Sequence, residues 1–203
     1  LKVRDPHKHQ NKLYNKDFFV KDIYSVKKYS LPVLLDVDVD YLLFGSLNKT
    51  SLKKNIGKRS PWLYPDKLVK LLNKKFPKRI CTTIAYSVNG GFTPILYKFF
   101  GDEINLRLRR SHLDGGLEKV FTLRNETIAS YSKDDLDNAF KYADRAVSLL
   151  QNSKNLDETF KRKFLAHIYL WLHNICWNNG KKEDARLYYE KAIKNDQTLR
   201  VAD

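Results

Sequence analysis

The chain has 203 residues, 42% hydrophobic and 13% aromatic, which is enough for one sizeable domain with a small appendage. No apolar run reaches the ~18–20 residues of a membrane-spanning helix, and residues 1–14 are too polar and charged for a signal peptide. Only Cys81 and Cys176 are present, too few for a disulfide scaffold, so we expect a cytoplasmic protein with no membrane partner.

The formal net charge of +15 is concentrated in the first two thirds of the chain. Residues 131–203 hold 13 Lys and Arg against 11 Asp and Glu, so the remaining 25 basic and 12 acidic residues lie in residues 1–130. Such a surface could attract nucleic acid, an acidic membrane or an acidic peptide, or it could be a solvated loop. No nucleic-acid-binding motif accompanies the charge, so nucleic acid is not favoured as a partner, and an oligomer stays open.

Residues 31–44 are rich in Leu and Val, as in a buried strand, yet they carry Asp36, Asp38 and Asp40 at two-residue spacing. Alternate side chains of a strand share one face, so the three carboxylates would lie together. Burial of neighbouring like charges would require a multivalent cation such as Mg, Ca or Mn. The alternative is an amphipathic strand with a solvated acidic face, in which Val37 and Val39 face the core. The apolar residues on both sides of the aspartates favour the metal-binding interpretation.

The next segments alternate between helix and strand patterns. A helical stripe begins at Asp66 and ends before Pro77, and the β-branched run 79–87 predicts a second strand. A turn with Asn89, Gly90, Gly91 and Thr93 follows, and a helix begins near Pro94. This order predicts a parallel α/β sheet, whose chemistry gathers at the carboxyl ends of its strands. The two glycines would let the backbone approach a substrate there.

From about residue 131 the pattern is helical only, with helices predicted over 134–151, 157–178 and 182–195. The small residues Ala185 and Ala192, with Tyr189 between them, are typical of a tetratricopeptide hairpin, in which two helices approach closely. We therefore divide the chain into an α/β metal-binding domain over 1–130 and a small all-α tetratricopeptide-like segment over 131–203.

Four motifs within residues 31–108 together resemble an arginase-like family that includes the peptide arginases: Asp-Val-Asp-Val-Asp-Tyr-Leu, Ser-Pro-Trp-Leu, Ser-Val-Asn-Gly-Gly-Phe-Thr-Pro and Tyr-Lys-Phe-Phe-Gly-Asp-Glu. The resemblance implies the parallel-sheet arginase/deacetylase fold and two divalent cations, expected to be Mn. It also implies an earlier Asp-x-His motif, for which Asp5-Pro6-His7-Lys8-His9 has the spacing. The implied metal ligands are Asp38, Asp40, Asp36, Asp5, His7 and His9, and the implied substrate-binding residues are Asn89, Gly90, Gly91 and Thr93.

The expected function is therefore hydrolysis of arginine residues in a peptide to ornithine and urea. Because the chain is basic and its substrate side chain is cationic, we expect a substrate with a separate acidic leader segment, held at residues 49–59 or beside the helical repeats. The alternative is a non-catalytic module that binds a peptide or protein through its helical repeats and basic surface. His167 and His173 lie in predicted helices, where packed or surface histidines are more common than metal ligands.

Overall fold

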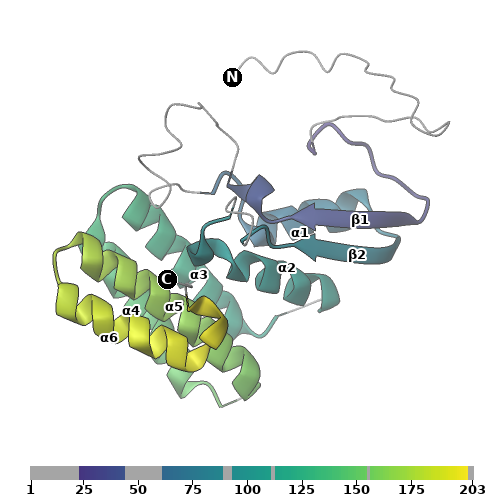
Figure 1. Cartoon of the computed structure of the whole chain (residues 1–203). Coiled ribbons are helices and arrows are strands. Elements are labelled where there is room, and N and C mark those ends of the chain that lie inside the picture. The colour runs from purple at the N-terminus through teal and green to yellow at the C-terminus, as the bar shows by residue number, and fades with distance from the viewer. Residues whose placement is uncertain (1–22, 44–60, 89–92, 111–112, 155, 201–203) are drawn as a thin grey trace.

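The computed structural model describes residues 23–43, 61–88, 93–110, 113–154 and 156–200, and 66% of these are helical. Figure 1 shows a small sheet with two helices beside it at one end of the molecule and a group of helices at the other. The elements in chain order are β1 (Val33–Asp38), η1 (Asp40–Leu42), α1 (Pro65–Lys75), β2 (Arg79–Ala85), η3 (Ile95–Tyr97), α2 (Phe99–Arg109), α3 (Gly115–Ser132), α4 (Leu136–Asn152), α5 (Glu158–Asn178), α6 (Lys182–Asn195) and η4 (Gln197–Leu199).

The sheet consists of β1 and β2, which pair in parallel as the sequence predicted. Asp36 lies opposite Thr83 and Asp38 opposite Ala85, so the two strands end side by side. Along β1 burial alternates: Val37 is buried, whereas Asp36 and Asp38 are exposed. The strand is thus amphipathic, with one face on the core and the acidic face in solvent.

The prediction of a parallel-sheet arginase/deacetylase-like domain is wrong for the described residues, which form only two strands and are mostly helical. The physical reason lies after Thr93, where apolar residues recur at helical spacing and bury against other helices. No further strand is available to widen the sheet in the part of the chain that the structure describes. The fold class of these residues is helical.

Helices α3 to α6 form two antiparallel hairpins, α3–α4 and α5–α6, and α4 packs on α5. The three helices predicted from the sequence are confirmed as α4, α5 and α6, each within two residues of its expected bounds. Asp135 and Asp157 cap α4 and α5 by accepting hydrogen bonds from backbone N–H groups of the first turn. Gly180, with a φ of +73°, makes the turn into α6. The domain boundary predicted near residue 130 falls within α3.

The inner side of the hairpins is filled by η3 and the start of α2. The ring of Tyr97 lies 5.5 Å from that of Trp171 on α5, and the ring of Phe99 lies 4.7 Å from that of His167. Phe99 also lies against Arg124 of α3, with the guanidinium carbon 4.6 Å from the ring centroid. Because these rings are buried, the sheet end and the helical hairpins share one core. None of the described helices has the length and apolar character to cross a membrane.

Candidate functional site

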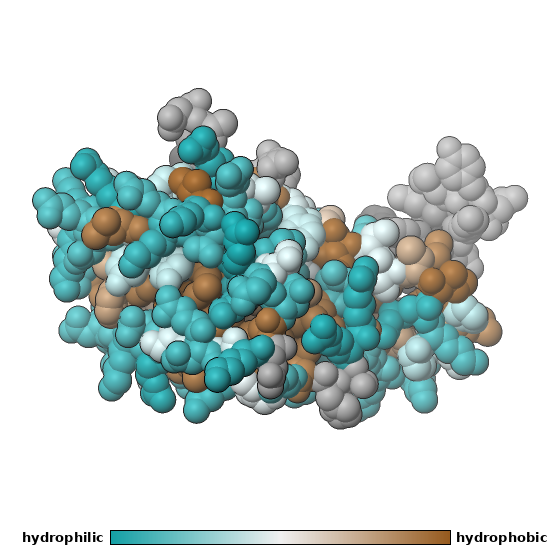
Figure 2. All heavy atoms as spheres, turned by 90° about the horizontal axis from the view of Figure 1, so that it is seen from below, coloured by the Kyte–Doolittle hydropathy of each residue, from teal (hydrophilic) through white to brown (hydrophobic). Residues whose placement is uncertain are grey.

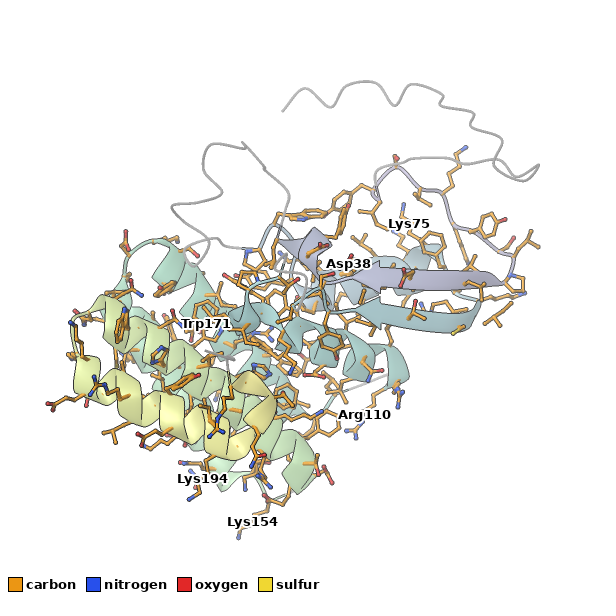
Figure 3. The ribbon with its side chains drawn as sticks, in the orientation of Figure 1. Asp38, Lys75, Arg110, Lys154, Trp171 and Lys194 are labelled. Atoms are coloured by element: carbon orange, nitrogen blue, oxygen red, sulfur yellow. The ribbon has the colours of Figure 1, made fainter. Side chains whose placement is uncertain are left out.

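Two carboxyl groups meet where β1 ends. Asp38 is the last residue of β1, and Val39 has helical backbone angles, so η1 begins at Asp40 and the strand does not continue. This turn brings the Asp40 backbone N–H to 3.4 Å from Oδ1 of Asp38. Burial raises the pKa of Asp40, and the charge of Asp38 and a hydrogen bond to its carboxyl group raise it further. Figure 3 shows Asp38 at the end of β1 that faces the helical hairpins.

Ser87 completes this cluster from the end of the neighbouring strand. Its Oγ donates a hydrogen bond of 2.7 Å to Oδ1 of Asp38, across 49 positions of sequence. The φ of Ser87 is +52°, a left-handed conformation that residues other than glycine rarely adopt. The Ser87 carbonyl also accepts a 3.1 Å hydrogen bond from the backbone N–H of Thr93. The base of the predicted glycine turn therefore lies beside Asp38. We name Asp38, Asp40 and Ser87 the carboxylate cluster.

The other predicted site residues divide into two groups. Asp36 is not part of the carboxylate cluster, because its carboxylate accepts a 2.5 Å hydrogen bond from Oγ1 of Thr83 on β2. Thr93 is buried, and its Oγ1 has no hydrogen-bond partner among the described residues. Outside the described residues lie the candidates Asp5, His7, His9, Asn89, Gly90 and Gly91.

The exposure of β1 corrects one step of the sequence argument. Burial of the strand carboxylates was expected to require a cation, but Asp36 and Asp38 are exposed, as the amphipathic alternative had it. Asp40, moreover, lies outside the strand, so the three carboxylates do not share one strand face. The closeness of Asp38 and Asp40 instead shows itself in the raised pKa of Asp40. Within the described ranges, no three His, Cys, Asp or Glu side chains are grouped closely enough to hold a metal ion.

The end of β2 is fixed to α2 by Tyr86, which sequence reasoning did not single out. Its hydroxyl donates a 2.8 Å hydrogen bond to Asp102, and burial together with the Asp102 charge raises the pKa of Tyr86. The ring lies directly over Gly101, where an added Cβ would be 2.5 Å from Cε1 of Tyr86. Glycine at this position permits a close approach of helix and strand that no other residue allows. This contact holds the residue before Ser87.

A buried ionic network joins α2 to α3, and sequence reasoning missed this too. Glu103 accepts hydrogen bonds of 2.6 Å from both Arg124 and Arg107, and Arg107 also binds Glu118 through two parallel hydrogen bonds of 2.7 and 2.8 Å. Glu103 and Arg124 are 0% and 1% exposed, and burial lowers the pKa of Arg124. The four-residue spacing of Glu103 and Arg107 on one helix was the only local signal for this network.

The two histidines of α5 agree with the expectation that they are packed. His167 is fully buried against Phe99, and neither of its ring nitrogens has a hydrogen-bond partner among the described residues. Nδ1 of His173 lies 2.9 Å from the carbonyl oxygen of Ala185. Both residues therefore contribute to the packing of the hairpins.

Comparisons of the chain with protein-family models, with curated proteins and with solved structures find no match. The resemblance to the arginase-like family thus depends on the motifs quoted from the sequence alone.

Proposed function

We propose that this chain is a metal-dependent hydrolase that converts arginine residues of a peptide to ornithine and releases urea. The observation that carries the proposal is the carboxylate cluster: two adjacent carboxyl groups and a hydroxyl at the carboxyl ends of two parallel strands. The choice of substrate comes from the arginase-like motifs in the sequence.

The donor atoms of the carboxylate cluster suit a divalent cation. Carboxylate and hydroxyl oxygens are hard donors, the type that Mn²⁺ and Mg²⁺ prefer. The charge of Asp38 helps to raise the pKa of Asp40, and a cation held by both groups would offset this repulsion and keep both ionised. A cation of this kind supplies a bound water whose pKa is lowered towards neutrality. Further ligands would come from residues 5–9.

The chain's own residues would then orient the metal-binding carboxylate and attract the substrate side chain. Ser87 holds Oδ1 of Asp38 in place through its hydrogen bond. Oδ2 of Asp38 does not take part in that bond. The negative charge of Asp38 and Asp40 acts at short range on a cationic guanidinium side chain, whereas the surrounding lysines are screened beyond ~8–10 Å in physiological salt. A basic protein can therefore still attract an arginine side chain to this point.

The test is to measure bound Mn²⁺ in the full chain by elemental analysis, and ornithine formation from an arginine-containing peptide. We expect Asp38→Ala and Asp40→Ala to lose both bound metal and activity. Asp36→Ala is the matched control: it removes a carboxylate from the same strand face but, because that group is bonded to Thr83, should keep both. A folded wild-type chain that binds no Mn²⁺, or full metal content in Asp38→Ala, would contradict the proposal.

The alternative function, binding of a peptide or protein by the helical repeats, has less support. The inner side of the hairpins, where a peptide would bind, is packed against Tyr97 and Phe99 of the same chain. A peptide bound by the helices would have to use a different surface.

A further inference from the structure

Apolar side chains are exposed where the two strands begin. The exposed fractions are 47% for Tyr29, 61% for Leu31, 77% for Leu34 and 72% for Ile80, and we name these four residues the strand-start patch. Two backbone hydrogen bonds join the two segments that carry this patch. The Tyr29 N–H donates to the Lys75 carbonyl at 2.7 Å, and the Val33 N–H donates to the Lys78 carbonyl at 3.1 Å. Figure 2 shows hydrophobic side chains at the surface at the sheet end of the molecule.

The surroundings of the strand-start patch are basic. Residues 23–35 and 67–80 contain eight Lys and Arg and no Asp or Glu. Among them Lys27, Lys28, Lys74 and Lys78 are exposed. Asp36 and Asp38 lie in the second half of β1 and would repel negative charge there. A partner of this surface therefore needs apolar side chains together with negative charge at the strand-start end.

The backbone of β1 also has an open edge beside this patch. The N–H groups of Val33 and Val39 donate to carbonyls at the two ends of β2, so the alternate residues Leu34, Asp36 and Asp38 direct their backbone groups away from β2. No strand among the described residues pairs with that side of β1. An edge of unpaired N–H and C=O groups is a template for an added strand.

We propose that the open edge of β1, together with the strand-start patch, binds an extended peptide as an added strand, with the acidic residues of the peptide at the strand-start end. An anionic membrane would meet the charge, but pressing an open strand edge into lipid leaves its backbone groups unpaired. A second copy of this chain would bring the same eight basic residues against their equivalents. An extended chain that is acidic beside the strand-start patch and uncharged beside Asp36 and Asp38 satisfies the backbone edge, the apolar side chains and the charge together.

The position of this edge has a consequence for a peptide substrate, and that consequence rests on the proposed function. β1 has six residues, which at ~3.3 Å per residue span roughly 20 Å. An acidic segment bound near Leu34 would therefore place a residue about four positions away beside Asp38 of the carboxylate cluster. The binding itself requires no hydrolysis and is tested separately from it.

The experiment measures fluorescence anisotropy of labelled peptides with the full chain, at low and high salt. In each peptide every second residue is Val, and the others are Glu in one half and Thr in the other. The Glu half is N-terminal in one peptide and C-terminal in the other. We expect binding that weakens with salt, and no binding of the matching peptides with Lys in place of Glu. Leu34→Glu and Lys78→Glu should each weaken binding roughly tenfold. Leu187→Glu, at an exposed apolar position on α6, is the control and should leave binding unchanged.

Two further peptides test whether the backbone edge is used. One carries N-methyl groups on all its Val residues and the other on all its Glu and Thr residues, so that each loses the N–H donors of one side of the strand. One of the two should lose binding and the other should keep it. Equal binding of both, no binding of either Glu peptide at low salt, or Leu34-dependent binding to anionic vesicles or to a second copy would overturn the proposal. Binding of the peptide by the edge of β1 without any ornithine formation from an arginine-containing peptide would contradict the proposed function alone.

Discussion

Acidification should destabilise this fold through His167. The side chain is 1% exposed and lies against Phe99, with no hydrogen-bond partner for either nitrogen among the described residues. Burial lowers its pKa from 6.5 to about 3; Asp196 opposes this shift, while the charges of Lys98 and Arg124 add to it. The folded protein thus keeps His167 neutral over a pH range in which the unfolded chain takes up a proton.

The size of the effect follows from proton linkage. The unfolded state binds one more proton than the folded state between the two pKa values, so the free energy of unfolding falls as the pH drops from 6.5 towards 3. The change is ~1.4 kcal/mol per pH unit, and lowering the pH from neutral to 5 should therefore remove ~2 kcal/mol through this residue. That is a large fraction of a typical stability of ~5–15 kcal/mol.

The assay compares wild type with His167→Phe by urea unfolding at neutral pH and at pH 5. Other titrating groups are common to both chains, so their effects cancel in the difference, and wild type should lose ~2 kcal/mol more than the variant. Ile168→Val, a conservative change at the next residue of the same helix, is the control and should shift stability equally at both pH values. An equal loss in wild type and His167→Phe would show that the buried neutral histidine is not what makes the fold acid-sensitive.

Two packing predictions follow from the contacts of α2. Gly101→Ala should lower the free energy of unfolding by ~1–3 kcal/mol, because the new Cβ would overlap the ring of Tyr86. Gly115→Ala is the control: no atom lies within 4 Å of the added Cβ, so the thermal midpoint should stay nearly unchanged. Glu103→Gln should lower the free energy of unfolding by ~3–5 kcal/mol, because it leaves the Arg124 charge buried without its carboxylate partner. Denaturant midpoints measure this, and the double variant with Arg124→Met should recover part of the loss; a double variant less stable than Glu103→Gln would refute the reasoning.

The elements themselves could be predicted because their signals are local. The helical pattern of each segment lies within the segment itself, and it predicted α4, α5 and α6 to within two residues. The two strands and their parallel pairing were likewise predicted from the strand–helix–strand order. The size of the sheet was not, because a strand pattern in one segment does not say how many other strands will join it.

The contacts that build the carboxylate cluster could not be predicted, because they join residues that are far apart in the sequence. The hydrogen bond between Ser87 and Asp38 spans 49 positions. The two-residue spacing of the aspartates indicated a shared face, but only the packing of the other elements decides whether that face is buried or exposed. The turn at Val39, which separates Asp40 from the strand, has no strong sequence signal either.

The helical hairpins are best understood as a support for the carboxylate cluster. Phe99 fixes the start of α2, because it is held between Arg124 of α3 and His167 of α5. Three residues further on, Asp102 accepts the hydrogen bond of Tyr86, and the next residue after Tyr86 is Ser87, whose hydroxyl holds the end of β1. A two-stranded sheet has little stability by itself, so its geometry depends on this packing. Substitutions in the hairpins that loosen Phe99 should therefore disturb the carboxylate cluster without touching it.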